Sequence, residues 1–318
     1  MSAPDCLVIG IDLGGTKTQG VLYAVRPAGC GQDDVLASVT RPTRRGGKGV
    51  IATITQVAAE LLAARGMRTD ELAAIGIGVP GVVSAACGTV SHGVNIGIDQ
   101  DDLPLAAMVT ARLGVPAVMV NDVTAAMLGA AHALGVGDDV ALLSIGTGLA
   151  AGLLLDGKPR VGARGNVGEI GHLVYRAGGL PCACGQRGCL ELYASGSAVA
   201  RMWPQTSDGS PAVALLDAAA GGVPEAIEAR DEWLGALAHA VTVLGLTVDV
   251  GTIFLAGGVT RLGDRLLAGL QNELDRRARS SAFLQQIDLA SRLVIVDPHL
   301  QVGTLGAALS AFTRSGLT

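Results

Sequence analysis

The chain has 318 residues, of which 49% are hydrophobic, 16% are charged and only 3% are aromatic. This length favours two domains, and the 46 glycines are typical of an α/β protein with many tight turns. A net charge of -5, a pI near 5.5 and few aromatic residues exclude a basic or stacking surface for nucleic acid. Neither a bilayer-spanning run nor a signal-peptide pattern is found, so we expect a cytoplasmic protein with a small-molecule ligand and no membrane partner.

Two apolar runs near the start of the chain predict a β-hairpin. They cover residues 7–11 and 19–25 and flank the turn Asp12-Leu-Gly-Gly-Thr-Lys17. The turn offers backbone N–H groups free of Cβ atoms, a hydroxyl group and a cation, all of which suit a phosphate. The residues that supply them are Gly14, Gly15, Thr16 and Lys17. The spacing differs from that of a Walker loop, and glycine turns are also common in hairpins that bind nothing.

A turn of glycine and proline ends the next predicted strand. Helical apolar spacing over residues 50–65 is followed by a strand that ends in Gly78-Val-Pro-Gly81. This turn is either a plain connection or a place where the Gly81 backbone meets a ligand. Asn95, a little further on, offers an amide for the recognition of a hydroxyl group.

Asn121 and Asp122 stand between a predicted strand and a predicted helix. The apolar pattern gives a helix over residues 104–114, a strand over 115–120 and an alanine-rich helix over 124–134. Asp122 can cap this last helix, because aspartate is a favoured N-cap residue. It also follows the carboxyl end of a strand, where α/β sheets place their sites, and would there act as a base for a substrate that Asn121 orients. The two interpretations are compatible.

The pattern of the amino-terminal hairpin recurs in the middle of the chain. Apolar runs over residues 140–145 and 149–155 flank the turn Gly146-Thr147-Gly148. A third apolar strand, over residues 252–256, ends in the pair Gly257-Gly258. The recurrence predicts an internal duplication. The three glycine turns together predict a nucleotide site in a cleft between two α/β halves.

Residues 165–191, which we call the zinc loop, contain three cysteines and a histidine. Three thiolates and one imidazole are the ligands of a closed tetrahedral zinc site. The predicted ligands are His172, Cys182, Cys184 and Cys189. Buried or disulfide-linked cysteines fit less well, because Cys182 and Cys184 are too close in sequence to pair comfortably. Glu169 and Glu191 bracket the cluster, so zinc would also hold two carboxylates in place.

The rest of the chain is expected to supply packing. Helical spacing predicts helices over residues 197–202, 211–220, 230–246, 263–279 and 303–312, and an apolar run predicts a strand over 292–297. The glycines of the last helix indicate close packing. The isolated histidines and both tryptophans are expected to be structural: His132, His239, His299, Trp203 and Trp233. The cysteines outside the cluster are expected to be ordinary thiols: Cys6, Cys30 and Cys87.

Together these motifs resemble those of the ROK family (repressors, open reading frames and sugar kinases), and in particular its bacterial glucokinases. The likeness covers nearly the whole chain, and the zinc loop is its most specific part. It rests on Asp12-x-Gly-Gly-Thr-Lys17, Gly78-x-Pro-Gly81, Asn121-Asp122, Gly146-Thr-Gly148, Gly168-Glu-x-Gly-His172, Cys182-x-Cys184-Gly-x-x-Gly-Cys189-x-Glu191 and Gly257-Gly258.

The resemblance implies a two-domain α/β fold, that of the actin-like and hexokinase-like (ribonuclease H-like) ATPases, with the active site in the interdomain cleft. We expect a smaller domain over residues 1–120, onto which a helix at 303–318 packs, and a larger domain over 121–302 with the zinc loop. The implied activity is transfer of a phosphoryl group from ATP to a primary hydroxyl of a sugar, most simply glucose. The implied cofactors are Mg²⁺ and structural Zn²⁺, and we expect a homo-oligomer, either a dimer or a tetramer.

The resemblance also gives a role to each motif. It makes Asp122 the catalytic base and lets Asp12 help to position magnesium. His172 would bind zinc through one ring nitrogen and a sugar hydroxyl through the other. The implied sugar-binding residues are Gly81, Asn95, Asn121, Asp122, Glu169, His172 and Glu191. The implied nucleotide-binding residues are Asp12, Gly14, Gly15, Thr16, Lys17, Gly146, Thr147, Gly148, Gly257 and Gly258.

Two stretches depart from the family pattern. Val94-Asn95-Ile-Gly-Ile98 keeps the asparagine but lacks the usual tryptophan, and Val248-Asp249-Val-Gly251 replaces the usual Leu-Asp-Pro. The first departure keeps other acceptors open: another hexose, N-acetylmannosamine, N-acetylglucosamine or a glucose-like cyclitol. A sugar-sensing repressor is a second possible function. Family repressors carry an amino-terminal winged helix, for which a first strand expected to begin at Leu7 leaves no room.

Overall fold

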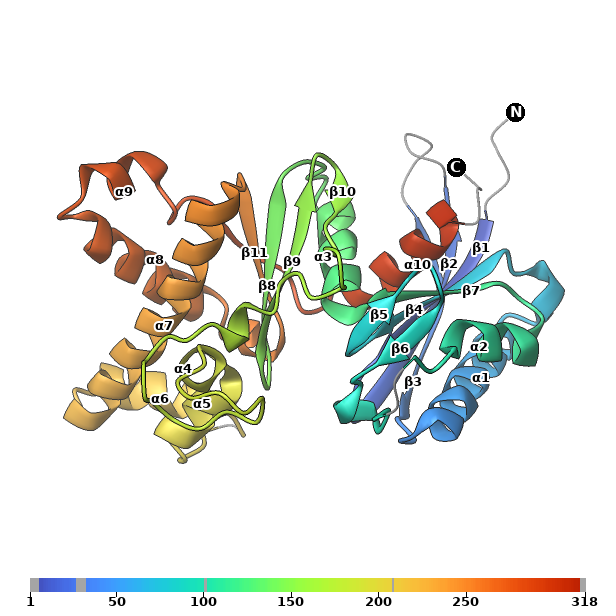
Figure 1. The fold of residues 1–318 in the computed structure, drawn as a ribbon, viewed down its shortest axis with the longest axis horizontal. Helices are drawn as coiled ribbons and strands as arrows, with labels where there is room; N and C mark the ends of the chain where they lie inside the picture. Colours follow the sequence, from blue (N-terminus) through green and yellow to red (C-terminus); the bar gives the residue numbers. More distant parts are fainter. Residues whose placement is uncertain (1–5, 27–32, 100–101, 208, 315–318) are drawn as a thin grey trace. The chain divides into compact units, whose positions relative to one another are not determined.

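The computed structural model describes residues 6–26, 33–99, 102–207 and 209–314 (Figure 1). Its contacts form two units, each with its own sheet. The first comprises Met1–Val136, Val161–Asn166 and Gln301–Thr318, and the second comprises Gly137–Arg160 and Val167–Leu300. The domain limits expected from the sequence, 1–120 and 121–302, stay a prediction. Cys30 and residues 315–318 of the expected last helix lie outside the described residues.

The first unit is built on a five-stranded sheet with the strand order β3-β2-β1-β4-β7. Its strands are β1 (Cys6–Leu13), β2 (Lys17–Val25), β3 (Asp34–Pro42), β4 (Ala74–Val79) and β7 (Ala117–Asn121). Strands β1, β2 and β3 are antiparallel neighbours, whereas β1, β4 and β7 run parallel. The predicted amino-terminal hairpin is therefore confirmed, with Leu13 opposite Thr18 beside the turn.

Helices cover both faces of this sheet. On one face, α1 (Gly47–Ala63) and α2 (Leu105–Leu113) bury their apolar side chains against Ile9, Ile11 and Ile75. On the other face, α10 (Val302–Arg314) packs on β1 and β4 and also on α3 (Asp122–Ala133). The short elements of the unit are η1 (Thr69–Glu71), β5 (Val82–Ser84), β6 (Thr89–Ser91) and η2 (Val94–Ile96).

Glycines let α10 approach its neighbours. A Cβ atom at Gly10 or Gly76 would lie 1.9 or 1.8 Å from a carbonyl oxygen of α10. A Cβ atom at Gly306 of α10 would lie 1.8 Å from the carbonyl oxygen of Ala125 in α3. Real side chains cannot occupy these positions, so the close packing expected from the glycines of the last helix is confirmed.

The second unit contains a sheet of the order β10-β9-β8-β11-β12. Its strands are β8 (Val140–Ile145), β9 (Leu149–Leu155), β10 (Lys158–Pro159), β11 (Thr252–Ala256) and β12 (Leu293–Ile295). Its helices are η3 (Ile170–His172), α4 (Glu191–Ala194), α5 (Gly196–Met202), α6 (Pro211–Ala220), α7 (Pro224–Val248), η4 (Gly258–Leu262), α8 (Asp264–Ala278) and α9 (Ala282–Ile287). The core is centred on the fully buried Trp233 of α7, which packs with residues of α4, α6 and the sheet.

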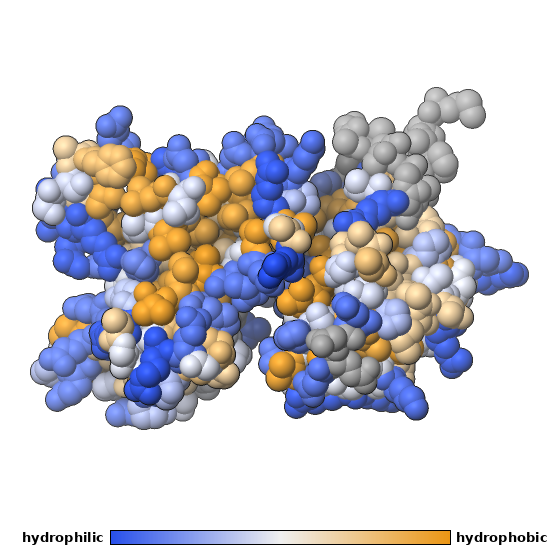
Figure 2. Space-filling view, in the orientation of Figure 1, coloured by the Kyte–Doolittle hydropathy of each residue, from blue (hydrophilic) through white to orange (hydrophobic). Residues whose placement is uncertain are grey.

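The two sheets share one topology, which confirms the predicted duplication. In each, three antiparallel strands are followed by two parallel ones: β8, β9 and β10 correspond to β1, β2 and β3, while β11 and β12 correspond to β4 and β7. Figure 2 shows hydrophilic side chains over the surface of both units and apolar ones gathered over α7 and β8. No helix among the described residues is long and apolar enough to cross a bilayer.

Candidate active site

The turn between β1 and β2 is held by hydrogen bonds to a threonine that sequence reasoning missed. Gly14 N–H donates to the carbonyl oxygen of Lys17 at 3.0 Å and closes the turn. Thr43, just after β3, donates its hydroxyl to the Gly14 carbonyl oxygen at 2.6 Å and its N–H to the Thr16 carbonyl oxygen at 3.0 Å. The Thr43 hydroxyl also pairs with that of the buried Thr18 at 2.8 Å. The turn is therefore a preorganised loop with exposed Thr16 and Lys17 side chains.

Asp12 and Asp122 lie close enough to influence each other. Burial, and next the negative charge of Asp122, raise the pKa of Asp12 from 3.8 to about 6, against the opposing effect of Lys17. Gly303, at the start of α10, has no side chain to displace Asp12: a Cβ atom there would lie 2.9 Å from Asp12 Oδ2. Two acidic side chains beside a phosphate-type turn form an arrangement that a bound cation would stabilise.

The junction of β7 and α3 corrects one interpretation of Asp122. The N-cap residue of α3 is Asn121, whose Oδ1 accepts hydrogen bonds from the N–H groups of Val123 at 3.0 Å and Thr124 at 3.1 Å. Asp122 is the first residue of the helix and accepts from Val123 N–H at 2.9 Å. The cap interpretation of Asp122 was wrong because the asparagine one position earlier has the extended backbone that a cap requires.

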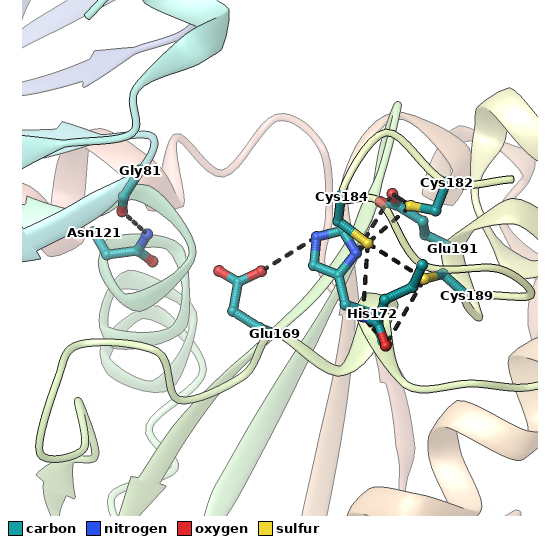
Figure 3. Close-up of polar contacts among 9 residues, drawn as sticks. Gly81, Asn121, Glu169, His172, Cys182, Cys184, Cys189 and Glu191 are labelled. Carbon is teal, nitrogen blue, oxygen red and sulfur yellow. Dashed lines mark hydrogen bonds and ion pairs between the residues drawn. The ribbon is translucent and has the colours of Figure 1, made fainter. Parts of the chain in front are cut away.

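Asn121 also connects the cap to the Gly78-Val-Pro-Gly81 turn. Its Nδ2 donates to the Gly81 carbonyl oxygen at 3.2 Å (Figure 3). Gly81 has a φ of +110°, and a Cβ atom there would lie 2.7 Å from the Ser91 carbonyl oxygen, so the position requires glycine. Substrate contacts by Gly81 and Asn121 stay predictions.

Asn95 lies against the β1–β2 turn. It belongs to η2, where its side chain is exposed while that of Ile96 is buried. A Cβ atom at Gly15 would lie 2.8 Å from the Asn95 carbonyl oxygen and 3.2 Å from its Cβ atom. The first unit thus brings the turn, Asn95, the Gly81 turn and the two aspartates together around β1 and β7.

In the second unit, the other two glycine turns border a pocket. Gly257 has a φ of +96°, and a Cβ atom there would lie 2.5 Å from the Ile145 carbonyl oxygen, so β11 meets the end of β8. A pocket of about 680 Å³ lies beside them. Its lining includes Gly146, Thr147, Gly196, Ser197, Ser210, Gly258 and Arg261. Small-molecule pockets span about 300–1,000 Å³, so this one suits a nucleoside-sized ligand.

Sequence reasoning missed several polar residues of this pocket. Ser210 caps α6 by accepting from Val213 N–H at 3.4 Å, and Pro211 follows it, which is a recognisable start signal for a helix. Arg261 lies in η4, three residues after Gly258, and is exposed. Its nearness to the glycine pair was the only signal in the sequence that could have marked it.

The zinc loop is anchored on β9 through glycines. A Cβ atom at Gly168 would lie 1.7 Å from the Ala151 carbonyl oxygen, and one at Gly171 would lie 2.2 Å from that of Leu149. Ala151 N–H donates to the Gly168 carbonyl oxygen at 2.8 Å. The Gly-Glu-x-Gly-His motif therefore spaces its glycines to lie on β9.

The predicted zinc ligands converge. Their ligand atoms all lie within 4.8 Å of one another: His172, Cys182, Cys184 and Cys189. The Cys182 Sγ–His172 Nδ1 distance is 3.8 Å and the Cys184 Sγ–Cys189 Sγ distance is 3.6 Å (Figure 3). A tetrahedral zinc with Zn–S bonds of about 2.3 Å holds its ligand atoms about 3.8 Å apart, so the cluster fits this ion. No disulfide joins the described cysteines.

The protonation of these thiols also favours a cation. Burial raises the pKa of Cys189 to about 12, and it also raises the pKa of Cys182. Only Cys184, with the backbone N–H of Gln186 beside its sulfur, has a lowered pKa, of about 7. Three crowded thiols would not ionise together unless a positive charge offsets their repulsion, and zinc binding supplies that charge.

The two glutamates of the loop flank His172. Glu169 Oε2 lies 4.0 Å from His172 Nε2, and Glu191 Oε1 lies 3.9 Å from His172 Nδ1 (Figure 3). Glu191 also approaches the second glycine turn, since a Cβ atom at Gly148 would lie 2.9 Å from its Oε2. The metal cluster, both carboxylates and the turn therefore form one continuous region of the second unit.

The duplicated sheets and the acidic first turn define the class of actin-like and hexokinase-like ATPases. The ROK family model matches residues 8–312. The chain therefore belongs to the ROK family, as the motifs indicated.

Characterised relatives include kinases for two sugars. The chain is 31% identical over 296 residues to a glucokinase of Streptomyces coelicolor, with 85% of this chain and 87% of the relative covered. It is 28% identical over 252 residues to an N-acetylmannosamine kinase of Yersinia pseudotuberculosis, with 79% and 82% covered. A ROK family glucokinase of Streptomyces griseus, solved with glucose and AMPPNP, is similar in structure with a TM-score of 0.75 and 28% identity, over 96% of this chain and 99% of that chain.

Proposed function

We propose that this chain is an ATP-dependent sugar kinase that phosphorylates the primary hydroxyl of glucose and forms glucose 6-phosphate. The observation that carries the proposal is the pair of Asp12 and Asp122 beside the β1–β2 turn. Phosphoryl transfer requires a proton acceptor for the attacking hydroxyl and charge neutralisation at the phosphates, and this pair can serve both. The ROK family match and the glucokinase relatives support glucose as acceptor.

Asp122 is the proposed proton acceptor. It is half-buried at the first turn of α3, and the hydrogen bond from Val123 N–H holds its carboxylate in place. Asp12 would hold Mg²⁺, a cation that neutralises the charge of the transferred phosphoryl group when it is bound. Lys17 and the N–H groups of the turn would contact phosphate oxygens, and Gly14, Gly15 and Thr16 shape that turn.

The pocket of the second unit is the proposed place of the nucleotide. Its lining includes Gly146, Thr147 and Gly258, and its volume suits adenosine. Gly146, Thr147, Gly148, Gly257 and Gly258 keep the nucleotide-binding role that the family resemblance implies. Calorimetry with ADP and a variant that fills the pocket, Ala200→Trp, would test this part: ADP affinity should fall in that variant and stay unchanged in Ala63→Trp.

Zinc is proposed to be structural, with its four protein ligands leaving no open position. Its function would be to fix the ring of His172 and the carboxylates of Glu169 and Glu191, which together with Asn95, Asn121 and Gly81 would contact sugar hydroxyls. A sugar is discriminated by rigid donors and acceptors, because each unpaired buried polar group costs affinity.

A second candidate acceptor is N-acetylmannosamine. It is favoured by the relative from Yersinia pseudotuberculosis and by the loss of the tryptophan near Asn95. A panel of hexoses, amino sugars and cyclitols in a coupled ADP-release assay decides between the candidates. The proposal predicts the highest kcat/KM for glucose, and an N-acetylated sugar in that place would overturn it.

A homo-oligomer and a cytoplasmic location stay predictions from the sequence. Light scattering of the purified chain would test the first, with a mass of twice or four times 31.9 kDa as the expected result. A mass of 31.9 kDa would contradict it.

A further inference from the structure

The segment between β3 and α1, residues 43–46, contacts both the β1–β2 turn and the loop that carries Asn95, although no motif marks it. At one end, Thr43 makes the hydrogen bonds to the Gly14 and Thr16 carbonyl oxygens described above. At the other end, the side chain of Arg45 and the backbone of Gly46 reach the second loop. We call residues 43–46 the connector.

Two hydrogen bonds join the connector to the Asn95 loop. Arg45 Nη2 donates to the Val94 carbonyl oxygen at 2.9 Å, and Gly46 N–H donates to the Ile96 carbonyl oxygen at 2.8 Å. The two acceptors lie on either side of Asn95. Gly97, with a φ of +72°, lets the connector approach, because a Cβ atom there would lie 2.9 Å from Gly46 N.

The Val94 end of the Asn95 loop, residues 93–98, is held partly from within the loop: Gly97 N–H donates to the Val94 carbonyl oxygen at 3.1 Å. Ile96 and Ile98 are buried in the core, whereas the side chain of Val94 is 63% exposed. Within the loop, Ile96 N–H and Ile98 N–H both donate to the Gly93 carbonyl oxygen, at 3.0 Å each. The Arg45 guanidinium adds a hydrogen bond to the same carbonyl oxygen from outside the loop, and a charged donor makes a stronger hydrogen bond than a neutral one.

We propose that Arg45 is a positioning residue for the acceptor sugar, acting through Asn95. The inference rests on the proposed function, since Asn95 matters as a sugar contact only if the chain binds a sugar. Through Thr43 the connector is also bonded to the β1–β2 turn. It would therefore help to fix the distance between the Asn95 loop and this turn.

The chain offers a matched control one residue away. Arg44 is exposed like Arg45 and carries the same charge, but its guanidinium donates to Gln56 Oε1 of α1 at 3.3 Å and does not contact the Asn95 loop among the described residues. Arg44→Ala and Arg45→Ala therefore remove equal charge and differ in the contact to Val94. Any effect of charge alone on nucleotide binding would appear in both variants.

Steady-state kinetics with glucose and ATP test the proposal. Loss of a hydrogen bond from a charged donor corresponds to roughly tenfold in an equilibrium. We expect Arg45→Ala to raise the KM for glucose by about this factor with little change in the KM for ATP, Arg45→Lys to recover part of it, and Arg44→Ala to match the wild type. In an Asn95→Ala background, Arg45→Ala should have no further effect on the KM for glucose, because the Asn95 side chain through which Arg45 acts is already absent. Equal KM values for glucose in both arginine variants, or additive effects in the double variant, would overturn the proposal.

Hydrogen exchange of the amides of residues 93–98 tests the anchoring without any substrate. Exchange should be faster in Arg45→Ala than in Arg44→Ala. Equal exchange would refute the anchoring itself. A wild-type chain that phosphorylates no sugar, with faster exchange in Arg45→Ala, would instead refute the proposed function and with it the assignment to the acceptor, leaving only the anchoring.

Discussion

The two sheets have the same strand order, yet the turns between their first two antiparallel strands differ in charge. The β1–β2 turn carries Asp12 and Lys17 and has Asp122 nearby. The corresponding β8–β9 turn is Gly146-Thr147-Gly148, has no charged residue of its own, and borders the pocket of the second unit. The two sheets therefore share a strand order but differ in the residues at their first turns, which are charged in the first unit and uncharged in the second.

The edge strands β7 and β12 occupy corresponding places in the two sheets, but the residues that follow them differ. Strand β7 is followed directly by Asp122, and β12 is followed by Val296 and then Asp297. Asp122 is half-buried in the first turn of the twelve-residue helix α3, whereas Asp297 is exposed and accepts from His299 N–H at 2.8 Å within a loop. The two aspartates therefore differ in burial and in the element that holds them, and only Asp122 has the setting of the proposed base.

The largest effect is expected from Asp122→Asn. The amide keeps the size of the side chain and an oxygen for Val123 N–H but cannot accept the proton of the sugar hydroxyl. Turnover should fall by about 10²–10⁴-fold, the usual loss for a general base, while sugar affinity stays within a fewfold of the wild type. Asp297→Asn, the equivalent change in the second unit, should leave turnover unchanged. Wild-type turnover in Asp122→Asn, measured by ADP release, would remove Asp122 from the mechanism.

The second unit can be tested through its metal cluster. Chelation, or Cys189→Ser, should lower the melting temperature and weaken sugar binding about 10–100-fold, because His172, Glu169 and Glu191 lose their support. Cys87→Ser removes an exposed, free thiol and should change neither quantity. Calorimetry with sugar gives the affinity. If stability falls while sugar affinity is kept, the metal serves the fold alone.

Packing of α10 in the first unit is tested by Gly306→Ala. The new Cβ atom would lie 1.8 Å from the Ala125 carbonyl oxygen of α3, so the helices must separate. We expect a loss of about 1–3 kcal/mol or more in the free energy of unfolding in urea. Gly251→Ala is the control, because nothing lies within 4 Å of its Cβ position. Equal stability of both variants would show that α10 packs more loosely than described.

Asp12 should make the free protein less stable as pH rises. Its pKa is 3.8 in the unfolded chain and about 6 in the folded protein. Between about pH 4 and pH 6 the folded protein binds more protons than the unfolded chain, so the free energy of unfolding falls with rising pH, by up to about 3 kcal/mol. Asp12→Asn should remove this slope and raise stability at pH 7. If the pH dependence of the free energy of unfolding, measured in urea, is the same in Asp12→Asn as in the wild type, the raised pKa of Asp12 is not its cause.

The smallest effect is expected at the other end of α3. His132 Nε2 lies 2.8 Å from Asp33 Oδ2; the side chain of His132 is 48% exposed and that of Asp33 only 7%. The hydrogen bond with Asp33 raises the pKa of His132, and the bond with His132 helps to lower the pKa of Asp33 against its burial.

The stabilisation should therefore be lost as pH rises through the raised pKa of His132, and also as pH falls through the lowered pKa of Asp33. His132→Gln should cost less than about 1 kcal/mol in unfolding experiments at pH 6, since exposed pairs contribute little. A variant with exposed His299 changed to Gln is the control. A loss several times larger would mean that His132 has a further role.

Much of the fold and of the candidate site could be predicted from the sequence, because apolar runs and glycine turns are local signals. The β1–β2 hairpin, the second glycine turn and the cysteine cluster were all predicted correctly. Strand β3 was missed, since it lies at the sheet edge and all nine of its residues are exposed or half-buried, which weakens its apolar pattern. Helix α9 was missed because it has only six residues and none of them is buried.

Contacts between distant segments could not be predicted. Thr43 and Arg45 stand in a polar stretch without a motif, and their partners at Gly14 and Val94 become neighbours only when the sheet forms. Asp33 and His132 are 99 positions apart. The cap interpretation of Asp122, one of two compatible ones, failed because aspartate and asparagine cap helices equally well, and only the backbone shows which residue precedes the helix.

The proposed reaction is the transfer of the γ-phosphoryl group of ATP to a primary hydroxyl of glucose. Phosphorus NMR of a reaction with wild-type protein, ATP, Mg²⁺ and glucose tests it directly. We expect ADP and a phosphomonoester whose phosphorus couples to the two protons of a CH₂ group. Coupling to a single proton, or inorganic phosphate as the only new product, would contradict it.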